Sequence, residues 1–382
     1  MEDLVTDSLP EALTNKLILD GQKLNWHKDR VDAWLRGERI APITIDMALT
    51  RACSYNCYFC YATLQDNDGS RMTKDVIYRF MEDAAEIGVK AISFVSDGES
   101  TVSPHLNDAI IYGKENGLDM ALGTNGFLLK DEKLPDILPC LTYLRFNFSA
   151  GEPKRYAEIM GTKEENYHKV VNTVKEAVKI KKQNNLDVTI GLQMVLQPKD
   201  VDQIIPLVKL GKEIGVDYTV IKHCSDDEDG SLGVDYDGYH EEHVVNTLKE
   251  AEGYSDGNYL VKAKWSKILS GGLRHYDKCY GTPFIFQISG SGLLAPCGKL
   301  FNEKYEEHHI GSIVDTSFKE LWESDKYWEK HNYLHSSKFD PRTMCGNLCL
   351  QHKVNERLFD IKENDIKLPA PSGSPPMHVN FV

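Results

Sequence analysis

Three cysteines lie close together in the segment RACSYNCYFCYA, residues 51–62. Cys53, Cys57 and Cys60 follow the pattern C-x3-C-x2-C, directly after an apolar run that predicts a buried strand. Structural zinc uses four protein ligands, whereas three thiolates can hold three irons of a four-iron cube and leave the fourth iron open. Soft thiolates favour such a centre over hard cations. The spacing therefore indicates an iron–sulfur cluster with one position for an exogenous ligand. The alternative is a cysteine-rich loop that fills space or binds zinc with a remote fourth ligand.

Four more cysteines form a second group. Cys279 and Cys297 bracket a predicted hairpin with a Gly-Ser-Gly turn, and Cys345 and Cys349 lie in the segment CGNLC. Four converging thiolates occupy every ligand position of one cluster, so electron transfer is the task expected of such a site. Zinc is the alternative here as well, because thiolate quartets are among its usual sites.

Composition limits the classes of function. The chain has 382 residues and a formal net charge of −14, which argues against a general nucleic-acid binder and against binding to anionic membranes. No apolar run reaches the length of about 18 residues that a membrane span needs, and the first residues lack the apolar region of a signal peptide. We therefore expect a cytoplasmic protein with reduced thiols, whose cysteines serve metal binding or catalysis.

The elements that must position these thiols alternate between strand and helix. Apolar patterning predicts six consecutive β–α units between residues 42 and 253, which implies an α/β fold with a parallel sheet and right-handed crossovers. Six units are too few for a closed eight-fold barrel, so a partial barrel or a doubly wound sheet remains. In both, the chemistry lies at the carboxyl ends of the strands. The predicted strands are 43–49, 90–96, 118–126, 142–151, 186–196 and 216–224.

The alternation divides the chain into four parts. Residues 1–41 form a leader with one short helix, and residues 42–265 form the partial barrel. Residues 266–362 carry the second cysteine group and one or two helices, and residues 363–382 form a tail rich in Pro and Gly that is either docked or disordered. The acidic run 226–229, after the sixth strand, is expected to be a solvated loop.

The first cysteine motif, with the aromatic residue Phe59 before its last cysteine, resembles that of the radical S-adenosylmethionine (SAM) superfamily. The resemblance covers residues 42–253 and implies a partial (β/α)6 TIM-like barrel. It also implies a [4Fe–4S] cluster whose open iron binds the amino and carboxylate groups of SAM. SAM is then cleaved reductively to a 5′-deoxyadenosyl radical, which takes a hydrogen atom from the substrate.

Further motifs of that superfamily occur in order along the chain. The segment 97–100, Asp-Gly-Glu-Ser, is similar to the Gly-Gly-Glu-Pro segment that contacts the SAM amino group, although only Gly98 and Glu99 match. Asn125 belongs to a Thr-Asn-Gly segment at the third strand, and Ser149 stands where the superfamily has a serine that reaches the SAM ribose. The usual aspartate after that serine is an alanine here. Gln193 is expected to face the barrel mouth.

The second cysteine group resembles the SPASM/twitch appendage of many radical SAM enzymes. A full SPASM domain has seven or eight cysteines, so Cys279, Cys297, Cys345 and Cys349 imply one auxiliary [4Fe–4S] cluster. Cys224 ends the sixth predicted strand and is a candidate hydrogen-atom donor to a carbon radical. Its alternative role is that of a small buried residue.

The resemblance therefore predicts an enzyme that abstracts a hydrogen atom from a small molecule, such as a sugar or a nucleotide-linked metabolite, and ends in oxidation or epimerisation. A flavodoxin or ferredoxin is the expected electron donor. The alternatives are a radical SAM maturase that modifies a peptide or protein, and a non-catalytic zinc or iron–sulfur scaffold. The leader of 41 residues is shorter than the leader-binding domain of about 80 residues common in peptide-modifying relatives, which favours the small molecule.

Overall fold

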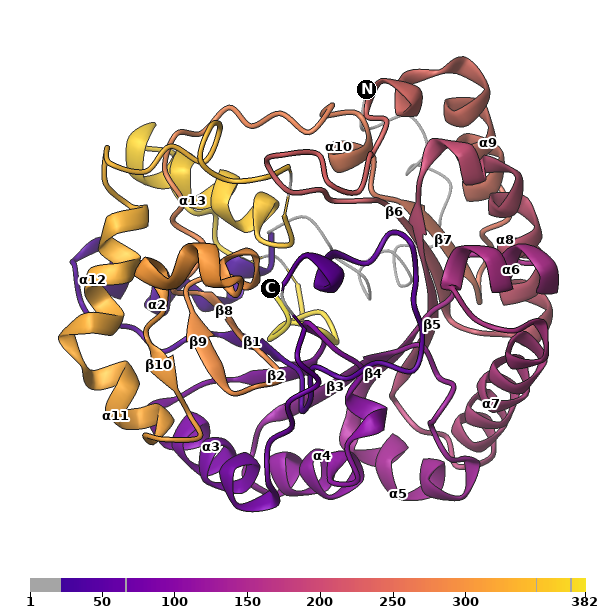
Figure 1. Cartoon of the computed structure of the whole chain (residues 1–382), viewed down its shortest axis with the longest axis horizontal. Coiled ribbons are helices and arrows are strands. Elements are labelled where there is room, and N and C mark those ends of the chain that lie inside the picture. The colour runs from indigo at the N-terminus through magenta and orange to yellow at the C-terminus, as the bar shows by residue number, and fades with distance from the viewer. Residues whose placement is uncertain (1–21, 66, 348, 372) are drawn as a thin grey trace.

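One sheet of ten strands runs through the protein, in the order β10-β9-β8-β1-β2-β3-β4-β5-β6-β7. The computed structural model describes residues 22–65, 67–347, 349–371 and 373–382. Figure 1 shows the strands curving around a central space with most helices on the outside. The strands are β1 (Thr44–Met47), β2 (Ala91–Phe94), β3 (Asp119–Thr124), β4 (Leu141–Asn147), β5 (Thr189–Leu196), β6 (Tyr218–His223), β7 (Leu260–Ala263), β8 (Ile285–Ile288), β9 (Leu293–Ala295) and β10 (Gly311–Ser312).

The strands from β8 through β1 to β7 are parallel to one another, whereas β9 pairs antiparallel with both β8 and β10. Helices between parallel strands cover the outer face, since a parallel connection needs a crossover. The helices are α2 (Lys28–Leu35), α3 (Lys74–Ile87), α4 (Leu106–Glu115), α5 (Leu134–Ile137), α6 (Pro153–Met160), α7 (Glu164–Gln183), α8 (Ile204–Ile214), α9 (Glu242–Glu252), α10 (Trp265–Ile268), α11 (Phe318–Glu323), α12 (Asp325–Leu334) and α13 (His352–Glu363).

Local sequence explains the outer helices. In α3, the buried side chains Val76, Ile77, Phe80 and Met81 recur at helical spacing and face the sheet. The helix ends at Gly88, whose φ of 96° lies in the left-handed region that glycine adopts without a steric penalty. The α/β fold with a parallel sheet is confirmed, as are the six predicted β–α units.

The structure differs from the expected organisation at both edges of the barrel sheet. β7 extends it beyond the sixth unit, and β8 of the predicted hairpin pairs in parallel with β1. The expected boundary at residues 265/266 therefore falls between two strands of the same sheet. Short strands such as β7 carry little local signal, and a local pattern does not show which distant strand they join. None of the described helices combines the length and apolar character that a membrane span requires.

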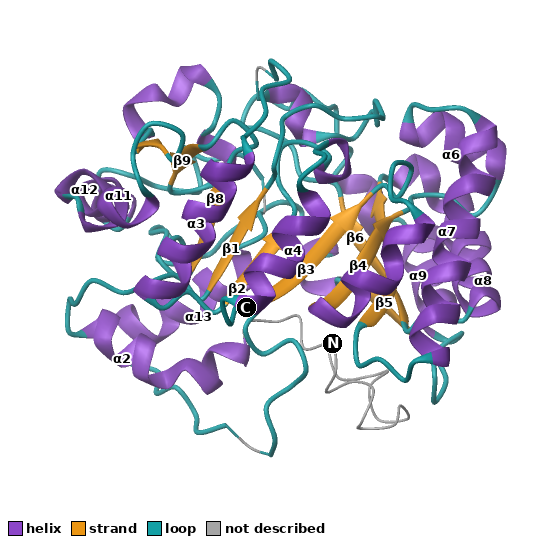
Figure 2. Ribbon diagram, turned by 90° about the horizontal axis from the view of Figure 1, so that it is seen from below, coloured by secondary structure: helices purple, strands orange, loops and turns teal. Residues whose placement is uncertain are grey.

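The tail rich in Pro and Gly docks against the amino ends of the barrel strands. The hydroxyl of Thr44, at the start of β1, donates to the carbonyl of Asn380 (2.7 Å), and the Asn380 amide donates to Asp119, at the start of β3 (2.8 Å). Thr189, the first residue of β5, hydrogen-bonds His378 (2.8 Å). Figure 2 shows the C-terminal end at this lower side of the strands. The tail thus closes the end of the barrel opposite the cysteine loop.

Candidate functional site

The first cysteine loop leaves the carboxyl end of β1, as expected for a functional loop in a parallel barrel. Its three thiols lie close enough together for the charge on one to shift the pKa of another. Burial, followed by the charges of Cys60 and Cys53, raises the pKa of Cys57 well above its ordinary value. The Cys57 thiol also donates to the carbonyl of Met160, at the end of α6 (3.4 Å).

Three soft donors on one loop fit a thiolate-held cluster. No group of three His, Cys, Asp or Glu residues in the described part of the chain is arranged to hold a single metal ion. The thiolates around a four-iron cube stand further apart than ligands around one ion, because the cluster lies between them.

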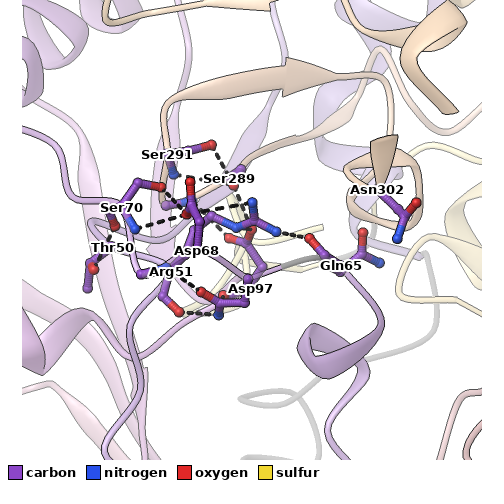
Figure 3. A network of polar contacts seen from close by, with 12 residues as sticks. Thr50, Arg51, Gln65, Asp68, Ser70, Asp97, Ser289, Ser291 and Asn302 are labelled. Atoms are coloured by element: carbon purple, nitrogen blue, oxygen red, sulfur yellow. Dashed lines mark hydrogen bonds and ion pairs between the residues drawn. The ribbon is translucent and has the colours of Figure 1, made fainter. Parts of the chain in front are cut away.

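A buried polar network fixes the start of this loop (Figure 3). The guanidinium of Arg51 pairs with the carboxylate of Asp97, with 3.2 Å between Nε and Oδ2, and donates to the carbonyl of Gln65. Asp97 also accepts from the hydroxyl of Ser289 (2.5 Å) and the backbone N–H of Gly290 (2.8 Å). Because Ser289 and Gly290 form the turn between β8 and β9, the network joins the first cysteine loop to the hairpin that carries Cys297.

Two glycines make room for the backbone at the root of the loop. A Cβ atom on Gly98 would lie 1.9 Å from the carbonyl oxygen of Thr50, and one on Gly290 would lie 2.1 Å from its carbonyl carbon. Real Cβ atoms do not approach backbone this closely. Gly98 is therefore required by packing against the cysteine loop, in addition to any contact with a ligand.

Glu99 ties the end of β2 to the end of β3. One oxygen of its carboxylate accepts from the hydroxyl of Thr124 (2.7 Å), and the other accepts from the backbone N–H of Asn125 (2.8 Å). The Asn125 amide donates to the hydroxyl of Ser54 (3.1 Å) and points toward the Cys53 sulfur at 3.9 Å. The structure thus brings Glu99 and Asn125 together beside the cysteine loop.

The remaining residues predicted to contact SAM have different surroundings. Ser149 is fully buried, and its hydroxyl accepts from the backbone N–H of Val195 (3.2 Å), which joins the end of β4 to β5. Gln193 donates to the side chain of Asn147 (2.8 Å) and lines the central cavity, as does Phe59.

A cavity of about 420 Å³ occupies the barrel interior, a volume suited to small organic ligands. Cys60 of the first loop lines it, and so do Cys297 and Cys349 of the second group. Both cysteine groups therefore border one space. Side chains alternate between the two faces of a strand. This alternation places Asp46 of β1 and Arg145 of β4 in the lining of the cavity.

The four cysteines of the second group surround a small neighbouring cavity of about 30 Å³. Burial, and after it the charges of the other three thiols, raises the pKa of Cys279 well above its ordinary value. Arg274 donates toward the Cys345 sulfur at 3.7 Å and to the carbonyl of Asn347 (2.8 Å). Convergence of four thiols with a cation beside them fits a thiolate-held cluster, whose negative charge such a donor offsets.

Cys224 is fully buried, and the lining of the central cavity includes its neighbours His223 and Ser225 but not Cys224 itself. Its thiol is directed to the carbonyl oxygen of Phe59 (3.7 Å). Burial raises the pKa of Cys224 to about 12. A role as hydrogen-atom donor remains a prediction.

The expectation of a solvated acidic loop after β6 is wrong for two of its residues. Asp226 is 1% exposed and Asp227 is 7% exposed. Asp226 accepts from the backbone N–H groups of Leu232 (2.9 Å) and Val234 (3.2 Å), so the carboxylate orders its own loop. A cluster of acidic residues in a sequence does not reveal such backbone partners.

Sequence reasoning also missed the network residues Arg51, Asp97 and Arg274. In the sequence Asp97 stands out only as a departure from a glycine motif, although it joins segments almost 200 positions apart. A weak signal existed for Arg51, which stands two residues before the first cysteine. Arg274 lies near Cys279 in sequence, but its partners come from the segment 341–347.

The chain is similar to known proteins in sequence and in fold. The probable GTP 3′,8-cyclase of Saccharolobus islandicus is 23% identical over 277 residues, which cover 70% of this chain and 85% of that protein. The AdoMet-dependent heme synthase of Methanosarcina barkeri is 24% identical over 313 residues, 76% of this chain and 84% of that protein. The crystal structure of Streptococcus suis SuiB bound to S-adenosylmethionine superimposes with a TM-score of 0.61 at 16% identity, covering 81% of this chain and 72% of SuiB.

The radical SAM superfamily profile matches residues 47–217, from the end of β1 to the residue before β6. Members of this superfamily are enzymes that use a [4Fe–4S] cluster and SAM, and the similar structure of SuiB has SAM bound. The matched region contains the first three cysteines, Gly98, Glu99 and Ser149. Over residues 47–217, this chain is therefore similar to the radical SAM superfamily.

Proposed function

We propose that this protein is a radical SAM enzyme acting on a small molecule in the central cavity, with its SAM-binding cluster on Cys53, Cys57 and Cys60. When bound, the cluster and SAM supply a 5′-deoxyadenosyl radical that abstracts a hydrogen atom. The observation that carries the proposal is the position of the three-thiol loop, at the carboxyl end of β1 and on the wall of the cavity. The matched superfamily region covers this loop.

The chain's own residues orient the parts of this site. Arg51 and Asp97 hold the root of the cysteine loop, and Glu99 joins the ends of β2 and β3 beside Cys53. The docked tail, including His378 and Phe381, closes the amino end of the barrel and so limits water entry from below. The ligand must then reach the cavity from the side of the cysteine loops.

We further propose an auxiliary [4Fe–4S] cluster on Cys279, Cys297, Cys345 and Cys349, in a SPASM/twitch-like region. Cys297 and Cys349 border the same cavity as Cys60, so an acceptor held there would stand next to the substrate. This arrangement favours oxidation as the outcome, with epimerisation as the alternative. A flavodoxin or ferredoxin would reduce the first cluster, and the reduced thiols suit a cytoplasmic enzyme.

A peptide or protein substrate is the alternative within the enzyme class, because the similar SuiB has also been crystallised with its precursor peptide SuiA. The cavity favours the small molecule, since its wall is continuous from the cysteine loops to the tail and its volume is about 420 Å³. A sugar or a nucleotide-linked metabolite has a suitable size.

The test is anaerobic reconstitution of the full chain, with iron and sulfide counting and with measurement of 5′-deoxyadenosine after addition of SAM and reductant. We expect about eight iron atoms per chain, two cubes of four. Replacing Cys53, Cys57 and Cys60 by Ala should remove about four of them and all 5′-deoxyadenosine. Cys140→Ala is the matched control, because this thiol belongs to neither group, and it should change neither quantity.

Replacing Cys345 and Cys349 by Ala should also remove about four iron atoms, while 5′-deoxyadenosine formation persists. Reconstituted protein that holds both clusters and yet forms no 5′-deoxyadenosine would contradict the enzymatic proposal and favour an iron–sulfur scaffold. Zinc in place of iron at the second group would contradict the auxiliary cluster alone.

A further inference from the structure

The central cavity is rich in cationic side chains, although the chain as a whole carries a net charge of −14. Its lining contains only two carboxylate side chains, Asp46 and Asp97, of which Asp97 is already paired with Arg51. Seven cationic residues line it: Lys23, Arg145, Lys222, Lys264, Lys267, Lys299 and Lys353. The excess of positive charge is therefore specific to this space.

Several of these cations have partners within the protein. Lys267 donates to the carbonyl of Cys349 (2.5 Å), Lys299 donates to the carbonyl of Asn347 (2.7 Å), and Lys353 pairs with Glu356 (2.7 Å). Lys23 donates to the carbonyl of Phe381 (2.6 Å). These four lysines support the structure of the cavity wall.

The other three, Arg145, Lys222 and Lys264, differ because their side chains make no hydrogen bond or ion pair with any group in the described ranges. The Arg145 Nε atom is buried without a hydrogen-bond partner. Burial, and after it the charges of Lys267, Lys222 and Arg145, lowers the pKa of Lys264 well below its ordinary value. Arg145, Lys222 and Lys264 are each half-buried, and cations that repel one another there without an ion-pair partner are costly, so their grouping calls for an anion.

Strand register explains why two of the three lie side by side. Ile221 of β6 pairs with Ala263 of β7, so the next residues, Lys222 of β6 and Lys264 directly after β7, follow side by side at the carboxyl end of this strand pair. The backbone N–H of Lys264 also donates to the carbonyl of Ile221 (2.9 Å). Arg145 lies two strands away on β4 and faces the same cavity.

A fourth polar group on this wall also has no partner. His223 is 3% exposed, lines the cavity, and has neither ring nitrogen hydrogen-bonded within the described part of the protein. Burial and the surrounding lysines, led by Lys267 and Lys222, hold the pKa of His223 well below its ordinary value. Its neutral imidazole can therefore donate one hydrogen bond to a ligand and accept another.

We infer that the substrate of the proposed radical SAM reaction carries an oxyanion, a phosphate or carboxylate group, that Arg145, Lys222 and Lys264 bind on the cavity wall. The inference rests on the proposed function for the identity of the site and names the class of molecule that it takes. Charge-assisted hydrogen bonds are the strong ones, and a guanidinium and two ammonium groups suit an oxyanion with several acceptor atoms. His223 supplies a neutral hydrogen bond beside them.

The test uses three probes that share an aromatic ring: phenyl phosphate, benzoate and the neutral benzyl alcohol. Binding is measured by anaerobic equilibrium dialysis against the reconstituted full chain, both without SAM and with saturating SAM. We expect at least one of the two anions to bind at one site per chain and benzyl alcohol to bind at least tenfold more weakly. Tighter binding of phenyl phosphate assigns the site to phosphate, and tighter binding of benzoate assigns it to carboxylate.

The variants Lys222→Met and Lys264→Met should each weaken anion binding at least tenfold, while Lys222→Arg should retain it. Lys175→Met is the matched control, because it removes one charge from the exposed face of α7, and it should bind like the wild type. Since Lys222 has no partner to lose, Lys222→Met should not lower the thermal unfolding midpoint, whereas loss of a structural lysine would.

Equal binding of benzyl alcohol, equal binding by Lys222→Met and Lys175→Met, or displacement of the anion by SAM would each overturn the inference. Displacement by SAM would mean that the cations hold the SAM carboxylate instead. The two proposals fail separately. Anion binding without 5′-deoxyadenosine formation contradicts the reaction alone, whereas 5′-deoxyadenosine formation without anion binding contradicts the substrate class alone.

Discussion

Arg51 and Asp97 show how a single ion pair positions a cofactor loop. Both side chains are nearly inaccessible, at 9% and 5% exposure, and both oxygens of the Asp97 carboxylate accept further hydrogen bonds from the turn after β8. An ion pair of this kind stabilises the fold mainly because neither charge is left uncompensated. Removal of one partner leaves the other charge unpaired in a low-dielectric environment.

Asp97→Asn should therefore lower the free energy of unfolding by about 3–5 kcal/mol, the usual cost of breaking a buried pair. The measurement is urea unfolding of the protein followed by circular dichroism. Asp68→Asn is the matched control, because Asp68 lies 3.8 Å from the same guanidinium but is 62% exposed, and its loss should cost at most about 1 kcal/mol. Equal losses in the two variants would contradict the role assigned to Asp97.

The raised pKa of Asp46 predicts that the stability of the protein depends on pH. Burial raises the pKa of this carboxyl from 3.8 to about 7, against the opposing attraction of Arg145 and Lys222 across the cavity. Between these two values the native protein retains a proton that the unfolded chain has released, so this contribution to stability is lost as the pH rises toward 7.

Asp46→Asn should remove that dependence. The unfolding free energy of the variant relative to the wild type should increase with pH across this window, by up to about 1.4 kcal/mol per pH unit. Urea unfolding of both proteins at several pH values measures the difference, and a difference that stays constant with pH would contradict the prediction.

At the scale of elements, periodicity predicted the outer helices and the first six strands because each has a local pattern. The 14 residues of α3 repeat their apolar positions at helical spacing, and glycine ends the helix. The pairing of β8 with β1 could not be predicted, since the register joins Thr44 to Ile285. α6 is not among the predicted helices, although Tyr156, Ile159 and Met160 recur at helical spacing before Gly161, and neither is α13, next to CGNLC.

The candidate site, like the fold, can be predicted from the sequence only in part. The seven clustered cysteines are predictable, because a metal motif is read from local spacing. The cations of the cavity are visible only once the strands are in register, since Arg145 and Lys222 belong to different strands and the side that each faces depends on the barrel. Net charge describes the whole chain and does not show the sign of the charge in its interior.

The docked tail is an element whose contribution to stability can be measured. Phe381 packs against Ala91, Ala121 and Tyr143 at the lower end of the barrel, with ring centroids of Phe381 and Tyr143 5.0 Å apart. Phe381→Ala should lower the free energy of unfolding by about 3 kcal/mol, the low end for a buried phenylalanine. Urea unfolding measures the loss.

Leu273→Ala, at a side chain that is 76% exposed, is the control and should change stability by less than about 0.5 kcal/mol. Comparable losses in the two variants would show that the tail does not stabilise the barrel.

For the whole molecule, β1 is an interior strand, with β2 on one side and β8 on the other. The two cysteine groups therefore belong to one continuous sheet, even though more than 200 positions separate them in sequence. A chain that ends at residue 265 would lack β8. β1 would then become an exposed edge strand made of residues that are buried in the full-length protein.

We expect the fragment that ends at residue 265 to aggregate, because an apolar edge strand pairs with other chains. Size-exclusion chromatography of the soluble fraction, beside the full-length protein, is the measurement. A soluble monomeric fragment with native-like circular dichroism would contradict this expectation and show that the barrel region folds on its own.

The narrow space around Thr50, between Gly98 and Gly290, has a consequence for how the protein matures. Gly98 follows the thiols at 53–60 closely in sequence, whereas Gly290 comes more than 200 positions after them, so a nascent chain exposes these thiols long before both glycines are present. Delivery of iron and sulfide to these thiols should therefore follow, and not precede, synthesis and docking of the turn that contains Gly290.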